Sequence, residues 1–175
     1  MPAAKRFWYD LKRAPKHIAE FNETPLLLHH TTPYNAVGII KGGIFSHAFA
    51  NRVGTRLGGF PATQLDDGMG NVSLLVSPFA FTHSNKVTFI MSHLRLKRRN
   101  QLREPKSLRA SNGVMPEVYA KVRIAPRDFM GILIGRDCES YLANEIVEAA
   151  SRKGIPVYSQ KHDDGRRIWP ETGGS

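Results

Sequence analysis

A chain of 175 residues, 41% hydrophobic and 23% charged, has the size and composition of one globular domain with its own core, which excludes a disordered or fibrous protein. Cys138 is the single cysteine, so an internal disulfide and a zinc site built on several thiolates are excluded. The 25 lysines and arginines against 15 acidic residues give a formal net charge of +10, which predicts a polyanionic partner, nucleic acid ahead of anionic lipid.

The first 24 residues are basic and carry no recognisable targeting signal. The segment MPAAKRFWYDLKRAPKH lacks the apolar core of a signal peptide, and no run of the chain is long and apolar enough to cross a bilayer. We therefore predict a cytoplasmic protein with one domain over residues 1–175, residues 1–24 as a basic extension, and no membrane partner.

Residues 26–45 predict a strand followed by a short helix. The apolar run Leu26–Leu28 is typical of a buried strand, which we expect to end at the adjacent histidines His29 and His30. A helix is expected to begin soon after this pair, because the next residues carry helix signals at both ends.

The signals for this helix are an N-cap, a proline and a glycine stop. Thr32 is a suitable N-cap, and Pro33 suits the first helical position because its missing N–H would have no partner there. Gly42 or Gly43 can end the helix in a left-handed conformation. The predicted apolar face consists of Val37, Ile40 and Ile44.

The middle of the chain predicts two strands between irregular segments. We expect a short helix at 45–54 and a loop over 55–71. Residues 72–81 and 86–96 are rich in β-branched and aromatic side chains, which is typical of strands. Residues 95–116 are polar and strongly basic without a clear period, which predicts a long loop with room for one helical turn.

The last third of the chain predicts more strands and one longer helix. Residues 117–124 alternate apolar with polar side chains, so they form a strand that Glu117 begins. Residues 138–153 have helical spacing, with Gly154 as the stop. Further strands are expected at 131–135, 155–160 and 166–170. The predicted fold class is α+β with a largely antiparallel sheet.

His29 is the first candidate for a functional residue. It closes an apolar strand at the entrance to a helix, where free backbone N–H groups can bind an anion or ligand oxygens. The competing interpretation is that one histidine of the pair is partly buried and satisfied while the other is exposed. A metal site is not indicated, because the other five histidines, His17, His47, His83, His93 and His162, fall at no recognised ligand spacing.

Glu117 and the basic segment before it are the second candidate. A carboxylate at the start of a strand can be held rigidly beside a cleft, although an ordinary solvated glutamate fits the pattern as well. The basic segment could position phosphates of a nucleic acid, or it could simply be a solvated surface. Its cationic residues are Arg95, Lys97, Arg98, Arg99, Arg103, Lys106 and Arg109, against the single acid Glu104.

Two segments resemble a known family. LHHTTPYNAVGIIKGGI resembles the opening motif of ADP-ribosyltransferases, most closely that of the DarT toxins, which runs roughly L-x-H-x-T-x-x-x-N-h-x-x-I-h-x-x-G-h, with h apolar. The residues at motif positions are His29, Thr31, Asn35, Ile39, Gly43 and Ile44. PEVYAKVRIAPRDFMGILIG resembles the later DarT segment, in which Glu117 takes the place of the catalytic glutamate.

This resemblance implies a fold, a co-substrate and a set of roles. The fold would be ADP-ribosyltransferase-like, with a split, largely antiparallel sheet and flanking short helices. NAD+ would be the co-substrate, held by His29, Thr31 and Asn35, with Glu117 as the catalytic carboxylate and no metal. The family also supplies an arginine from a variable region, for which Arg52 and Arg56 are candidates and Arg56 is preferred.

The implied activity is mono-ADP-ribosylation of a base in single-stranded DNA or RNA. Such a modification would block replication or translation, which fits a toxin or phage-defence effector with an antitoxin protein as partner. Four alternatives remain: a metal-independent RNase toxin, an ADP-ribosyltransferase that modifies protein, an RNA 2′-phosphotransferase with a similar opening motif, and a nucleic-acid-binding module without chemistry.

Overall fold

The computed structural model describes residues 26–45, 71–77, 80–103, 117–121, 123–161 and 166–171. The predicted basic extension, the body of the helix expected at 45–54 and nearly all of the loop expected at 55–71 lie outside these residues.

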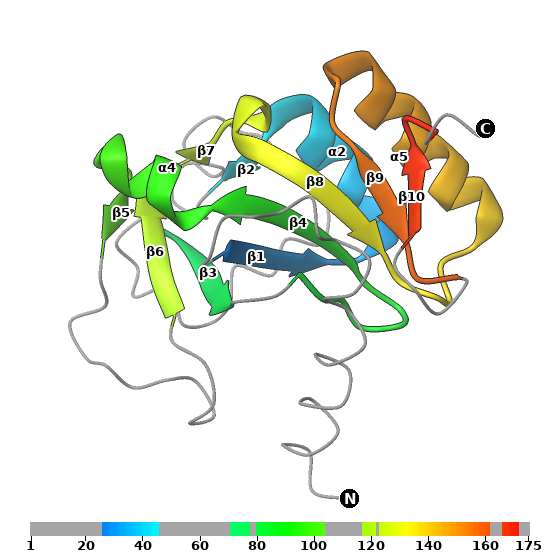
Figure 1. The fold of residues 1–175 in the computed structure, drawn as a ribbon, viewed down its shortest axis with the longest axis horizontal. Helices are drawn as coiled ribbons and strands as arrows, with labels where there is room; N and C mark the ends of the chain where they lie inside the picture. The colour runs from blue at the N-terminus through cyan, green and yellow to red at the C-terminus, as the bar shows by residue number, and fades with distance from the viewer. Residues whose placement is uncertain are drawn as a thin grey trace, which may run out of the picture.

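An eight-stranded sheet forms the centre of the described structure (Figure 1). Its strand order is β10-β9-β8-β4-β1-β3-β6-β5, and every neighbouring pair is antiparallel except β8 with β9. The largely antiparallel sheet that the sequence predicts is thus confirmed. The strands are β1 (Leu26–Thr31), β3 (Asn71–Ser77), β4 (Val87–Ser92), β5 (Leu102–Arg103), β6 (Glu117–Lys121), β8 (Phe129–Ile134), β9 (Val157–Ser159) and β10 (Arg166–Trp169).

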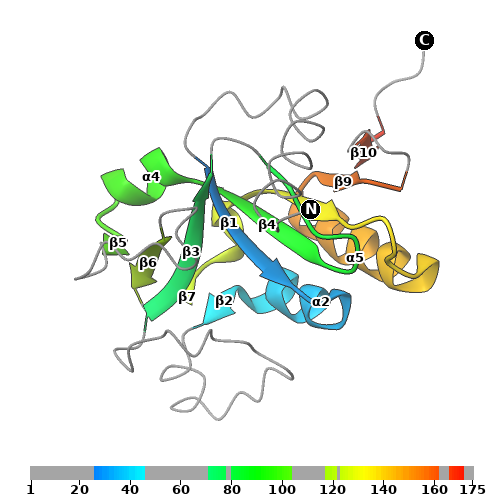
Figure 2. The ribbon, with the colours of Figure 1, turned by 90° about the horizontal axis from the view of Figure 1, so that it is seen from below.

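Two helices cover one face of the sheet (Figure 2). α2 (Pro33–Gly42) follows β1, and α5 (Ser140–Lys153) joins β8 to its parallel neighbour β9. Both helices contribute to one core cluster with β1, β4, β8 and β9; its members include Leu27, Ile40, Phe89, Ile132, Ile146 and Val157. A two-stranded sheet of β2 (Ile44–Phe45) and β7 (Arg123–Ile124) lies at the end of α2, and a 3-10 turn, η1 (Pro126–Asp128), precedes β8.

β1 is buried on both faces because it is a central strand. Leu27 packs in the cluster beneath α2 and α5, whereas Leu26 and Leu28 pack in a second cluster on the opposite face of the sheet. This alternation continues to the end of the strand. β1 runs through Thr31, one residue beyond the predicted end at His29 and His30. Neighbouring polar residues of β1 therefore face different sides of the sheet.

α2 has the bounds that its sequence signals predict, with three differences in detail. Thr32 occupies the N-cap position but makes no side-chain cap hydrogen bond. Gly43 ends the helix and its N–H donates to the carbonyl of Ile39 at 2.7 Å, but with φ +94° and ψ −175° it does not adopt the predicted left-handed helical conformation. Ile44, predicted on the apolar face of the helix, lies instead in β2; the buried helical residues are Pro33, Ala36, Ile39 and Ile40.

The strand predicted over 86–96 ends early. β4 stops at Ser92, whose hydroxyl accepts a hydrogen bond from the backbone N–H of Arg95 at 3.2 Å. This N-cap starts the six-residue helix α4 (His93–Arg98), in which Leu96 is buried. The first part of the predicted basic loop is therefore helical.

The strand predicted over 72–81 also ends early, because β3 stops at Ser77 and residues 80 and 81 are not in a strand. The single strand predicted over 117–124 is two strands, β6 in the large sheet and β7 in the small one. The strands β8, β9 and β10, and the helix that Gly154 ends with φ +70°, are close to their predicted positions.

Candidate active site

The two β1 residues of the opening motif point to the same side of the sheet. His29 pairs with Phe89 of β4 and Thr31 pairs with Val87, both on the face that α2 and α5 cover. His29 is 9% exposed and Thr31 2% exposed. An apolar strand thus ends in two buried polar side chains, two residues apart on one face.

Thr31 has a buried hydroxyl that lacks a hydrogen-bond partner among the residues that the structure describes. Leaving such a group unpaired costs about 1–3 kcal/mol. Its partner therefore comes from another segment of the chain or from a ligand. This hydroxyl is the feature that best fits a bound co-substrate with oxygen or amide groups.

Asn35 completes the motif one turn later. It is the third residue of α2, it is half-buried, and its backbone N–H donates to the carbonyl of Thr32 at 3.1 Å. His29, Thr31 and Asn35 therefore belong to one strand–turn–helix unit.

His30 lies on the opposite face and forms its own cluster. Its Nδ1 is 2.5 Å from the hydroxyl of Thr88, and its ring lies 5.0 Å from that of Phe81 and 5.3 Å from that of His83. Because Leu28 and His30 alternate with His29, neither histidine of the pair is exposed. The expectation that one of them would be solvated is wrong, since β1 is covered on both faces.

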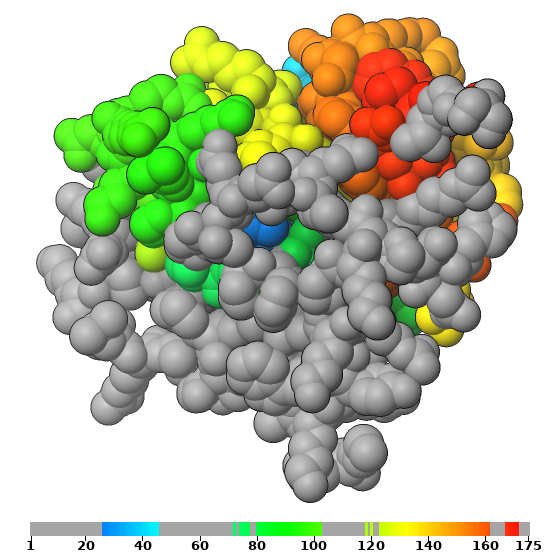
Figure 3. All heavy atoms as spheres, in the orientation of Figure 1, coloured from blue at the N-terminus to red at the C-terminus, as the bar shows by residue number. Residues whose placement is uncertain are grey.

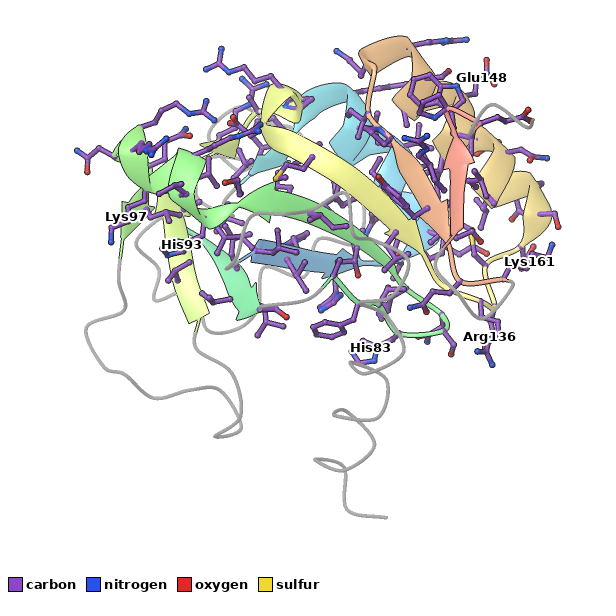
Figure 4. The ribbon with its side chains drawn as sticks, in the orientation of Figure 1. His83, His93, Lys97, Arg136, Glu148 and Lys161 are labelled. Atoms are coloured by element: carbon purple, nitrogen blue, oxygen red, sulfur yellow. The ribbon has the colours of Figure 1, made fainter. Side chains whose placement is uncertain are left out.

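The imidazole of His30 is neutral at physiological pH. Burial lowers its pKa from the ordinary 6.5 to about 3, and the positive charges of His83, His29 and Lys86 add to this effect. Figure 4 shows His83 at the lower edge of the view, well apart from His93 and Lys97 of α4 at the left.

The depressed pKa of His30 predicts a loss of stability in acid. Between pH 6.5 and pH 3 the unfolded chain binds a proton at this site and the folded chain does not, so the free energy of unfolding rises with pH in this window. This one group should lower that free energy by about 2 kcal/mol between pH 7 and pH 5. Urea denaturation of the wild type and of His30→Phe at both pH values measures it; an equal pH dependence in the two proteins would contradict the assignment.

Glu117 is placed by its backbone register. It begins β6, as predicted, and pairs with Leu75 of β3, which in turn pairs with Leu28 of β1. With neighbouring strands about 4.8 Å apart, the Cα of Glu117 lies roughly 10 Å from that of Leu28. This register places position 117 level with Leu28, on the face of the sheet opposite to that of His29 and Thr31. The structure therefore does not bring Glu117 onto one face with these two residues.

The candidate cationic residues of the basic segment, with Arg52 and Arg56, have four different locations. Arg95, Lys97 and Arg98 are exposed on α4. Arg99, by contrast, pairs through its guanidinium with the buried carboxylate of Asp128 in η1, so it has a structural partner. Arg103 lies in β5, and Lys106, Arg109, Arg52 and Arg56 lie outside the described residues.

Two features of the site were not found from the sequence. The cluster around His30 was missed because its members come from distant parts of the chain. They meet only because β1 is covered on both faces of the sheet. The helix α4 had a local signal, a serine directly before HLRLKR, that would have identified an N-cap.

Among the described residues no group of three histidine, cysteine or acidic side chains could hold a metal ion. None of the helices that the structure describes is long and apolar enough to span a bilayer.

This chain is similar to known proteins in its three-dimensional structure. No protein-family model matches the chain, and no curated protein matches it. Thermosipho africanus DarTG in complex with ADP-ribose is similar with a TM-score of 0.53 and 13% identity, over 79% of this chain and 50% of that one. This chain thus spans half the length of the DarTG chain.

A second structure, Thermus sp. 2.9 DarT in complex with NAD+, is similar with a TM-score of 0.47 and 10% identity, over 79% of this chain and 96% of that one. At these identities the similarity concerns the fold. The chain therefore has the α+β fold of the DarTG structure, as the resemblance of its two motif segments implied.

Proposed function

We propose that this protein is an NAD+-dependent mono-ADP-ribosyltransferase that modifies a base of single-stranded DNA or RNA. The observation that carries the proposal is the buried hydroxyl of Thr31, which has no hydrogen-bond partner within the described part of the chain and lies two residues from the buried His29 on the same face of β1. The shared fold with DarTG supports it, and that structure holds ADP-ribose. The formal charge of +10 favours a nucleic-acid acceptor over a protein.

The residues of this chain fit NAD+ by their chemistry. When bound, NAD+ supplies an electrophilic ribose carbon whose bond to nicotinamide breaks as the bond to the acceptor forms. The hydroxyl of Thr31 and the imidazole of His29 would hold the co-substrate by hydrogen bonds, with Asn35 as a third polar contact. An arginine at position 52 or 56 would add a positive charge, and no metal is required.

Glu117 is assigned the catalytic role. A fixed carboxylate stabilises positive charge that develops on the sugar, and it can accept the proton that the attacking base releases. The exposed cations Arg95, Lys97 and Arg98 would hold phosphates of the acceptor strand. Blocking replication or translation in this way makes the protein a toxin or phage-defence effector, for which we infer an antitoxin partner.

The test is transfer of label from NAD+ to separated pools of DNA, RNA and protein. The proposal expects label in a nucleic-acid pool. Label in protein alone would contradict the proposed nucleic-acid acceptor. Label in no pool would contradict the proposed transferase activity. RNA cleavage without NAD+ would instead identify the protein as a ribonuclease.

Thr31→Val tests the hydroxyl that carries the proposal. Valine keeps the shape of threonine, so we expect the KM for NAD+ to rise about 10-fold, the value of one lost hydrogen bond, while the free energy of unfolding does not fall. Thr88→Val is the matched control, because the hydroxyl of Thr88 is equally buried but bonds to His30 and should lose about 1 kcal/mol of stability. A loss of stability in Thr31→Val with unchanged KM would give the hydroxyl a structural role.

A further inference from the structure

A hollow at the C-terminal end of α2 is lined by four cationic side chains and no acidic residue. Its volume is about 310 Å³, and it is open to solvent. Figure 3 shows a notch at the upper edge, between the yellow atoms around η1 and the orange atoms at the end of α5, with a cyan atom of α2 between them. The lining residues are Lys41, Arg123, Ala125, Pro126, Arg127 and Lys153.

The four cations come from four different elements. Lys41 is in the last turn of α2, Lys153 in the last turn of α5, Arg123 in β7 and Arg127 in η1. All four are exposed. No salt bridge is recorded for any of them within the described residues, whereas the neighbouring Arg152 is bonded to Glu148 at 2.5 Å. Among the residues that the structure describes, no carboxylate therefore pairs with the positive charge of the hollow.

Structural roles account for only part of this charge. Lysines in the last turn of a helix compensate its dipole, which explains Lys41 and Lys153. Arg123 donates from Nε and Nη2 to the carbonyl of Gly42 at 3.2 and 2.9 Å, and its guanidinium lies 5.2 Å from the ring centroid of Phe45. These contacts hold Arg123 in place and use two of its five N–H donors. For Arg127 no such contact is found within the described part of the chain.

We infer that this hollow binds backbone phosphates of a nucleic-acid strand. Four converging cations repel one another, and a multivalent anion relieves that repulsion; arginine forks and lysine ammonium groups are the usual phosphate ligands. The uncharged lining consists of Ala125 and Pro126, which offer no aromatic ring or amide to recognise a base. The hollow therefore suits the phosphates of a passing strand better than a free nucleotide.

The hollow is distinct from the candidate active site. From Pro33, at the start of α2, to Lys41 the helix rises about 12 Å, at 1.5 Å per residue, and Thr31 lies before this start. A strand that contacts both ends of α2 would be held at a second point away from the reacting base. The inference rests on the proposed nucleic-acid acceptor, but the binding is measured without NAD+, so a failure of transfer and a failure of this site are separate results.

The experiment measures the affinity for a fluorescent single-stranded oligonucleotide at several salt concentrations. For Arg127→Gln/Lys153→Gln we expect about 10-fold weaker binding and a slope of log affinity against log salt that is smaller by about 1.4, from two lost phosphate contacts. The matched control is Arg136→Gln/Lys161→Gln, which removes the same charge at two residues that do not line the hollow and that lie near each other at the lower right of Figure 4. Its slope should remain close to that of the wild type.

Three results would overturn the inference. An unchanged slope in the first double variant would show that the hollow does not contact the strand. Equal changes in both double variants would show an effect of net charge alone. Saturable binding of inorganic pyrophosphate that Arg127→Gln/Lys153→Gln abolishes, with unchanged oligonucleotide binding, would identify a site for free phosphates.

Discussion

Replacing Glu117 with glutamine is expected to lower kcat for ADP-ribosyl transfer about 10³-fold, with a much smaller change in the KM for NAD+. Glutamine keeps the size of the side chain but removes its negative charge and its ability to accept a proton. Those two properties are needed in the transition state, when positive charge develops on the sugar, and electrostatic and acid–base effects of this kind are each worth 10²–10⁴-fold.

Glu148→Gln is the matched control for this change. Glu148 is on the exposed surface of α5, where its side chain is 67% exposed and pairs with Arg152. Its replacement should change kcat less than two-fold and the stability by only a few tenths of a kcal/mol. Thermal unfolding of both variants separates a catalytic effect from a folding defect. Undiminished transfer by Glu117→Gln would remove this residue from the mechanism, and equal losses in both variants would point to a general defect.

The parts of the fold that were predictable are those that local signals determine. The proline and glycine punctuation of Pro33–Gly42 gives its helix the correct ends, and the alternation after Glu117 identifies a strand that begins at that residue. Gly154 ends α5 in the left-handed conformation that its sequence context predicts. Each of these features is fixed by neighbouring residues, so one sequence is sufficient to find it.

The features that depend on the packing of distant segments were not predictable. The pairing of Arg99 with Asp128 joins residues 29 positions apart, and nothing in the basic run sets Arg99 apart from its neighbours. Likewise, His30 differs from His29 only in the face of β1 to which it points. The cationic hollow requires four separate elements to meet, which no local pattern encodes.

Gly43 is the residue of the opening motif whose replacement should destabilise the protein most. Its φ of +94° is a conformation that L side chains rarely adopt. A Cβ placed on it would lie 2.2 Å from the carbonyl oxygen of Ile124, which is backbone and cannot move aside as a side chain can. The close approach follows from the pairing of Ile44 with Ile124, which joins β2 to β7 directly after the helix.

We therefore expect Gly43→Ala to lower the free energy of unfolding by roughly 3 kcal/mol or more, from backbone strain and displacement of β7 together. The matched control is Gly38→Ala in the same helix, where no atom lies within 4 Å of the added Cβ and φ is ordinary. That change should raise stability by up to about 1 kcal/mol, because alanine favours the helix more than glycine does. Urea denaturation of the two variants measures the change in the free energy of unfolding, which should have opposite signs in the two. A Gly43→Ala protein as stable as the wild type would show that β7 can shift away from α2, and that the glycine of the motif is not required by the fold.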